Sequence, residues 1–225
     1  MYKIVFDHPD FLLVNKSPGV SVHKDLSDRG LLEVIKQDSQ LPSLFLTHRL
    51  DKPTSGLLLL AKNERANSQL SQSFQNRSIE KYYLALSAER PTKKQGQIKG
   101  DMAKARRGAW KLTRTSENPA ITRFFSYPVI GLGRLFLVRP YTGKTHQIRV
   151  ALKSIGTPIL GDHLYGGQLL NGEERCYLHA YALRFTLDGQ RYEFICAPSE
   201  GQGFMQAEVQ QLLVSIGPPW ELKWH

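Results

Sequence analysis

Residues 48–56 read HRLDKPTSG, and residues 57–61 continue the chain as LLLLA. The first segment places an arginine, an aspartate, a proline and a glycine within nine positions. A short apolar run bounded by turn residues is typical of a strand that is buried on both faces. Such a strand holds the reactive side chains of the preceding turn rigidly. We therefore expect a buried strand after Gly56 and identify Asp51 as the first candidate catalytic residue.

The overall composition is that of a globular protein with a strong positive charge. The 225 residues are 41% hydrophobic and carry a formal net charge of +10. This length allows one sizeable domain, or two subdomains that share a core. An excess of Lys and Arg favours a polyanionic partner, most often a nucleic acid. Some soluble proteins are basic without such a partner, so the charge alone only favours RNA or DNA.

The sequence carries no sign of a secreted or membrane protein. Cys176 and Cys196 are too few for a disulfide framework or a zinc cluster, so we expect reduced thiols. Residues 1–9 lack the apolar region of a signal peptide. No stretch approaches the roughly 20 apolar residues of a membrane helix. We expect a cytoplasmic protein without a membrane partner.

Apolar periodicity along the chain predicts many strands and few helices. Alternating or β-rich patterns indicate strands at residues 2–6, 11–15, 79–86, 120–127, 133–140, 177–187 and 191–197. Helical spacing appears at residues 31–36, 63–76, 146–152 and about 203–216. This order predicts an α+β fold around a large, mainly antiparallel sheet. No repeat or linker divides the chain, so we expect a single domain over residues 1–225.

Residues 90–114 are the most basic part of the chain. They contain nine Lys or Arg residues, and Asp101 is their only acid. Many such runs are solvated hairpins and loops. The near absence of compensating acids favours an electrostatic contact surface here. We expect this hairpin to contact a nucleic acid through Lys93, Lys94, Arg106 and Arg107.

The spacing of residues along the chain excludes a phosphate-binding loop and a recognised metal site. Residues 143–145 (GKT) resemble the end of a phosphate-binding loop, but the position five residues earlier is Val138 and not a glycine. The pairs Asp7/Asp10 near His8 and His146/His163 share no recognised spacing of metal ligands. We therefore expect no metal.

Six ordered stretches identify the chain as a member of the RluA family of RNA pseudouridine synthases. Residues 48–60 match the family signature His-Arg-Leu-Asp-x-x-Thr-Ser-Gly with its aliphatic run, and residues 81–85 (KYYLA) resemble Lys-x-Tyr-x-Ala. Residues 142–149 (TGKTHQIR) resemble a third element, and residues 15–19, 158–162 and 178–180 also fit in order. The resemblance runs from about residue 3 to 198. Ala151 and Ser17 depart from the usual histidine and proline, and we expect the catalytic domain without the S4 domain of many members.

The resemblance implies a pseudouridine synthase fold with an active-site cleft in its middle. It also implies isomerisation of a specific uridine in an rRNA or tRNA stem-loop. Asp51 would act as an ionised carboxylate that adds to the base or the sugar, or that takes a proton from the sugar. Arg149 would keep that carboxylate charged through an ion pair. Tyr83 would stack on the target base, although most strand tyrosines simply pack in a core.

The remaining site residues follow from the need to extract a base from folded RNA. By resemblance, Arg49 fills the gap that the flipped base leaves. Supporting or RNA-contacting roles fall to His48, Lys81, His146, Gln147 and Ile148. The reaction implies no cofactor, and we expect a monomer. A non-catalytic RNA-binding or RNA-chaperone protein is the alternative, and a glycosidic hydrolase would need a second catalytic carboxylate that no motif supplies.

Overall fold

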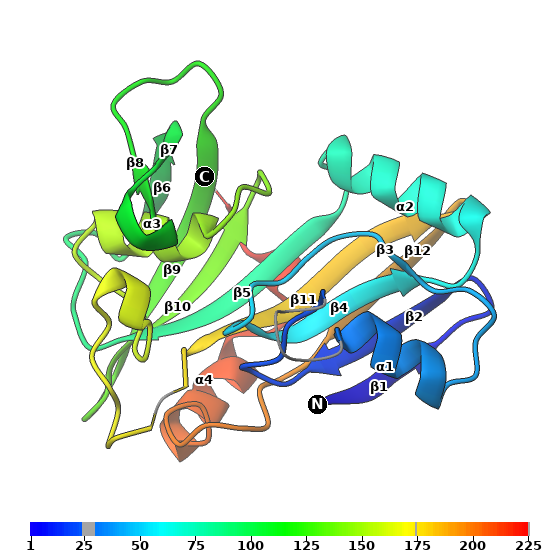
Figure 1. Ribbon diagram of the computed structural model, residues 1–225. Coiled ribbons are helices and arrows are strands. Elements are labelled where there is room, and N and C mark those ends of the chain that lie inside the picture. The colour runs from blue at the N-terminus through cyan, green and yellow to red at the C-terminus, as the bar shows by residue number, and fades with distance from the viewer. Residues whose placement is uncertain (24–29, 174, 225) are drawn as a thin grey trace. The chain divides into compact units, whose positions relative to one another are not determined.

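The computed structural model describes residues 1–23, 30–173 and 175–224, which form two compact units (Figure 1). The first unit comprises residues 1–80 and 180–196, and the second comprises residues 81–179 and 197–225. Each unit combines antiparallel strand pairs with helices, so the expected α+β class is confirmed. The single domain and the central cleft stay predictions.

The first unit contains a sheet in which β4 is an interior strand. Its strand order is β1-β2-β4-β11, with β3 paired to β4 and β12 paired to β11. The pairs β1–β2, β2–β4, β3–β4 and β11–β12 are antiparallel. The strands are β1 (Tyr2–Asp7), β2 (Phe11–Lys16), β3 (Phe45–Leu46), β4 (Ser55–Ala61), β11 (Leu178–Leu187) and β12 (Gln190–Ile195).

Strand β4 is buried along its whole length. All seven residues from Ser55 to Ala61 are buried, which confirms the strand expected after the HRLDKPTSG turn. Leu57 and Leu59 pack in one core cluster with Phe11 and Leu13 of β2. Side chains of a strand alternate between its faces, so burial of every residue means that both faces are covered. The turn before β4 is thereby attached to the interior of the first unit.

Two helices complete the first unit. Helix α2 (Glu64–Gln75) begins at Asn63, whose side-chain oxygen accepts a hydrogen bond of 2.9 Å from the backbone N–H of Ala66. This N-cap satisfies one of the amide groups that a helix start leaves unpaired. Ala66 and Leu70 are the buried residues of this helix, which the helical spacing of residues 63–76 predicts. Helix α1 spans Leu31–Asp38.

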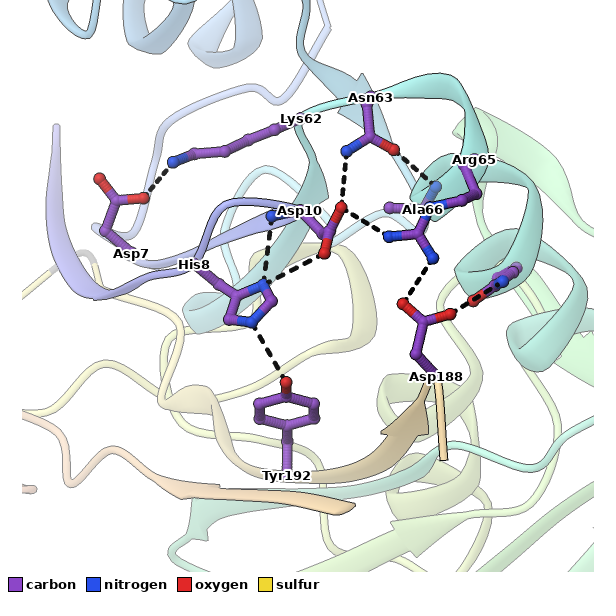
Figure 2. Close-up of polar contacts among 10 residues, drawn as sticks. Asp7, His8, Asp10, Lys62, Asn63, Arg65, Ala66, Asp188 and Tyr192 are labelled. Atoms are coloured by element: carbon purple, nitrogen blue, oxygen red, sulfur yellow. Dashed lines mark hydrogen bonds and ion pairs between the residues drawn. The ribbon is translucent and has the colours of Figure 1, made fainter. Parts of the chain in front are cut away.

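A polar network ties together three turns of the first unit (Figure 2). Asp10, in the turn between β1 and β2, accepts hydrogen bonds from Asn63 and Arg65 at the start of α2. Arg65 also pairs with Asp188, in the turn between β11 and β12. The bonds from Asn63 and then Arg65 hold the pKa of Asp10 below its usual value. The start of α2 is therefore fixed to both hairpins.

The second unit contains an antiparallel sheet and a separate two-stranded ribbon (Figure 1). The sheet order is β5-β10-β9-β6, and helix α3 packs against β8, β9 and β10. Its strands are β5 (Glu80–Ser87), β6 (Gln95–Gly100), β9 (Ala120–Val129) and β10 (Gly133–Pro140). The ribbon consists of β7 (Met102–Lys104) and β8 (Trp110–Leu112). The helices are α3 (Gln147–Ser154), α4 (Ala207–Ile216), η1 (Arg106–Gly108), η2 (His163–Tyr165) and η3 (Pro219–Glu221).

Helix α4 begins at Ala207, four residues after the start that the sequence suggests. Gly203 lies against Leu86 and Tyr177, and a Cβ at this position would come within 2.9 Å of both side chains. Phe204 is fully buried beside it. This tight packing occupies residues 203–204 in a buried turn, so the helix starts only beyond them.

Gly56 gives the first unit a testable requirement. Its φ is +107°, and a Cβ would lie 2.3 Å from the backbone oxygen of Ala180 in β11. Gly56→Ala should therefore lower the free energy of unfolding by about 2–4 kcal/mol, because both the backbone and the strand contact become strained. Urea unfolding measures the change.

Gly189→Ala is the matched control for that substitution. Gly189 also has a positive φ, +78°, but nothing lies within 4 Å of the position that an added methyl group would take. Its cost should be limited to backbone strain of about 1–2 kcal/mol. Equal losses in the two variants would contradict the close approach of Gly56 to β11.

Candidate active site

The turn that carries Asp51 is closed by its own backbone. The carbonyl of Asp51 accepts a hydrogen bond of 2.9 Å from the N–H of Thr54. Thr54 and Ser55 are buried at the start of β4, whereas Asp51 is only partly buried. The carboxylate therefore stands at the surface of the first unit on a backbone whose next residues are fixed in its interior.

A buried lysine fixes the other side of this turn. Lys16 is fully buried, and its ammonium donates to the carbonyls of Ser17, Val20 and Lys52 at 3.0, 2.8 and 3.1 Å. A buried ammonium is stable only when such acceptors replace water. Lys16 thus joins the loop after β2 to the residue that follows Asp51. The sequence placed it in a family motif but gave it no role.

His48 and Arg49 precede Asp51 in different environments. The Nε2 atom of His48 accepts a hydrogen bond of 3.0 Å from the N–H of Leu59, and its ring stacks on Phe74 at 4.4 Å. Arg49 is exposed, and Leu50 after it is buried. His48 is therefore attached to β4 and α2, and the side chain of Arg49 lies at the surface. Their expected contacts with RNA stay predictions.

Arg149 in the second unit forms a buried two-bond ion pair with Asp162. Its Nε and Nη2 atoms donate to the two carboxylate oxygens of Asp162 at 2.7 and 2.8 Å. The two residues are only 5% and 2% exposed. A planar guanidinium that binds a carboxylate through two bonds is fixed in orientation as well as in charge. Asp51 belongs to the first unit, and its expected ion pair with Arg149 stays a prediction.

Sequence reasoning did not assign a role to Asp162. The residue closes the stretch 158–162 (PILGD), which fitted the family pattern only as one of its ordered elements. The signal was therefore present, but a loop carboxylate 13 residues after an arginine has no periodic relation to it.

Tyr165 connects three parts of the second unit. Its hydroxyl accepts a hydrogen bond of 2.9 Å from the N–H of Trp110 in the basic ribbon, and it lies 2.9 Å from Nδ1 of His146. The guanidinium of Arg149 lies 5.0 Å from the centre of the Tyr165 ring. The ribbon, the TGKTH loop and the Arg149–Asp162 pair are therefore joined. No pattern in the sequence marks Tyr165.

Neighbouring tyrosines of β5 point to opposite faces. Tyr82 is fully buried, and its ring lies 6.3 and 5.6 Å from those of Trp220 and Trp224. Tyr83 is partly exposed. Since successive strand side chains alternate, Tyr83 lies on the face opposite this aromatic packing. The ammonium of Lys81, on the same face as Tyr83, lies 3.4 Å from the carbonyl of Thr142.

Gln147 is built into the start of α3. Its amide oxygen accepts bonds from the hydroxyl of Thr142 and the N–H of Lys144. Its amide nitrogen donates to the carbonyl of Ile121 and the hydroxyl of Thr122. Both Gln147 and its neighbour Ile148 are buried. These contacts shape the TGKTH loop from within, and the RNA contacts expected of both residues stay predictions.

The four basic residues selected from the sequence are all exposed. Arg106 and Arg107 lie at the tip of the β7–β8 ribbon. Two backbone hydrogen bonds close this tip, one between residues 105 and 109 and one between residues 109 and 106. Lys93 and Lys94 precede β6. The charges are thus carried on a projecting hairpin and a strand approach, where phosphates can reach them.

Two further findings concern the described part of the chain. Nowhere in residues 1–23, 30–173 and 175–224 do three His, Cys, Asp or Glu side chains gather as metal ligands would. Within the same ranges, every helix is too short or too polar to span a membrane.

Comparison with known proteins places this arrangement in a family. The model of the RNA pseudouridylate synthase family matches residues 10–154. The chain is 49% identical over 221 residues, 97% of both chains, to an uncharacterized RNA pseudouridine synthase of Haemophilus influenzae. It is 33% identical over 186 residues to the ribosomal large subunit pseudouridine synthase C of Rickettsia bellii, covering 79% of this chain and 61% of that protein.

Solved structures give the same assignment. The human RNA pseudouridylate synthase domain containing 1 superposes with a TM-score of 0.73 at 27% identity, over 91% of this chain and 86% of that one. The fold expected from the sequence is therefore confirmed. The chain belongs to the RNA pseudouridylate synthase family, the isomerases that convert uridine to pseudouridine in RNA.

Proposed function

We propose that Asp51 is the catalytic carboxylate with which this synthase isomerises a specific uridine of rRNA or tRNA. The observation that carries the proposal is the way the Asp51 turn is held. The buried ammonium of Lys16 binds the carbonyl of Lys52, and β4 anchors the residues after Thr54. A reacting group must be held within a fraction of an ångström of its productive position. In the described part of the first unit, Asp51 is held by these contacts and also lies within the family signature.

The three routes open to Asp51 all need an ionised carboxylate. It adds to the base, adds to the sugar, or takes a proton from the sugar, and a protonated acid does none of these. Exclusion of water by the bound RNA disfavours a charged carboxylate, so a nearby cation must offset that cost. We assign this role to Arg149, whose guanidinium Asp162 already orients. We assign stacking on the uracil to Tyr83 and filling of the vacated stack to Arg49.

The substrate class follows from the charge and from the relatives' names. The Rickettsia relative is named for the ribosomal large subunit, which favours rRNA over tRNA as the substrate. The exposed Lys and Arg residues of the basic hairpin suit the phosphates of a compact stem-loop. We further propose that the protein is a cytoplasmic monomer, that residues 1–225 form one catalytic domain, and that the reaction needs no cofactor or metal.

Asp51→Asn should abolish pseudouridine formation without unfolding the protein. The substitution keeps the size of the side chain and removes its charge, so kcat should fall on the order of 10³-fold or more. Carbodiimide treatment followed by primer extension on rRNA detects the product. Asp38→Asn, at an exposed carboxylate of the same unit, is the control and should retain full activity. An active Asp51→Asn enzyme would refute the assignment.

Arg149→Ala and Asp162→Ala should each lower the free energy of unfolding by about 3–5 kcal/mol. Either change leaves the other partner as a buried, uncompensated charge. The double variant should lose clearly less than the sum of the two single losses. Urea unfolding of all four proteins provides the cycle.

The exposed pair Arg65–Asp188 serves as the control for this cycle. Its side chains are 53% and 43% exposed, against 6% and 1% for Arg149 and Asp162. Asp188→Ala should therefore cost less than about 1 kcal/mol. Additive losses in the Arg149–Asp162 cycle would show that the buried pair is not coupled.

Replacing Lys93, Lys94, Arg106 and Arg107 together by Gln should weaken RNA binding and flatten its salt dependence. For each phosphate that is no longer bound, the slope of log K against log[salt] should fall by about 0.7–0.9. Filter binding at several salt concentrations measures the slope. A control variant with Gln at Lys3, Lys36, Arg77 and Lys223 removes the same charge from exposed sites elsewhere. Equal slopes for the two variants would mean that the hairpin makes no specific contribution.

A further inference from the structure

A hollow lies between the basic ribbon and the TGKTH loop of the second unit. Its volume is about 370 Å³, and its lining includes Trp110 and Met102 of the ribbon, Asp101, Asn118 and Lys144. Hollows of this size with an aromatic wall and a few polar groups are typical of small-ligand sites. Neither the proposed chemistry of Asp51 nor that of Arg149 uses these residues.

Asp101 presents a fixed, charged acceptor to this hollow. Its two carboxylate oxygens accept the backbone N–H groups of Glu117 and Asn118, each at 2.9 Å. The bond from Glu117, the side chain of Thr115 and the charge of Lys144 hold the pKa of Asp101 below its usual value. An ionised carboxylate only accepts hydrogen bonds, and its two oxygens have about four lone-pair positions, more than the backbone N–H groups of Glu117 and Asn118 occupy. The hollow therefore selects a ligand that offers two adjacent donors.

The remaining walls suit a nucleotide. Trp110 offers an aromatic face, which binds any base by stacking. Lys144 lines the hollow, and Lys104 is paired directly with Trp110 across the ribbon. These two ammonium groups provide positive charge for a phosphate beside a stacked base. Asp101 and Glu117 are the two acids of the lining, and Asp101 is the one whose carboxylate two backbone N–H groups hold in place.

We propose that this hollow binds one unpaired guanosine nucleotide of the substrate RNA, with the base stacked on Trp110 and its Watson–Crick edge on Asp101. Guanine presents two neighbouring donors, N1–H and the N2 amine, which match the two oxygens of one carboxylate. Adenine and cytosine each place a ring-nitrogen lone pair beside their amine, and that lone pair would face the negative charge. Uracil offers one donor between two carbonyl oxygens. Guanine alone complements the fixed carboxylate.

The hollow is joined to the catalytic part of the second unit. The backbone N–H of Trp110 donates a hydrogen bond to the hydroxyl of Tyr165, and the guanidinium of Arg149 lies over the ring of Tyr165. A guanosine held here would therefore be positioned within the same rigid set of contacts as Arg149. This assignment rests on the proposed function, since it makes the hollow a reader of sequence near the target uridine.

Nucleoside 5′-monophosphates provide a direct test that needs no catalysis. The chain has three tryptophans, so ¹⁵N-labelled protein should give three indole signals, and Trp110→Phe identifies the relevant one. Titration with GMP should shift the Trp110 signal, whereas the signals of Trp220 and Trp224 should stay in place. IMP lacks only the N2 amine and should bind about tenfold more weakly, the effect of one hydrogen bond to a charged group. AMP, CMP and UMP should bind more weakly still.

Variants of the protein make the same test from the other side. Asp101→Asn should remove the preference for GMP over IMP, and Glu89→Gln, an exposed acid of the same unit, should keep it. Asp101 also holds the backbone of residues 117 and 118, so a second variant keeps Asp101 and changes the stacking surface. This variant is Trp110→Ala, and competition of GMP with RNA measures how well it binds GMP. An unmoved Trp110 signal would overturn the site, and equal binding of GMP and IMP would overturn the reading by Asp101. Selective GMP binding by a protein that makes no pseudouridine would refute the proposed function alone.

Discussion

The contact between the backbones of Gly56 and Ala180 determines where the Asp51 turn can stand. No side chain fits between the two strands at this point, because a Cβ on Gly56 would overlap three backbone atoms of Ala180. The glycine allows β4 to run in the interior of the sheet, with all of its residues buried. The turn before it therefore cannot move without displacing the core of the first unit. Lys16 adds a second constraint, since its three carbonyl acceptors include that of Lys52.

The second unit contains a buried ion pair that fixes the orientation of a guanidinium group. Burying Arg149 and Asp162 removes both charges from water, which costs desolvation free energy. The attraction between the two charges only offsets that cost. In other proteins, replacing a buried ion pair by apolar residues of similar volume is often neutral or stabilising. What the pair supplies is a guanidinium in one orientation, with its plane set by two bonds and by the ring of Tyr165. Orientation is what an arginine needs if it is to meet a second carboxylate or a phosphate.

Most of the fold was predictable from the sequence, because its signals are local. The leucine run of β4 and the helical spacing of α2 each follow from residues that are neighbours in the chain. Candidate site residues were recognisable through motifs, but their partners were not. Asp162 and Tyr165 reach Arg149 from a loop whose path no periodicity predicts. Lys16 contradicts the usual expectation that a lysine is exposed, and only the three carbonyls around it explain its burial.

Asp101 shows why net charge describes only part of a nucleic-acid-binding surface. The Lys and Arg residues of 90–114 attract phosphates of any sequence, because every nucleotide carries the same charge. A carboxylate in their midst opposes that attraction, so its presence weakens binding unless it does something the cations cannot. Two backbone N–H groups fix it in place beside Trp110. A fixed acceptor distinguishes bases by their donors, and a cation cannot. Affinity and selectivity are therefore carried by different residues of the basic hairpin, and the acid that lowers the affinity provides the selectivity.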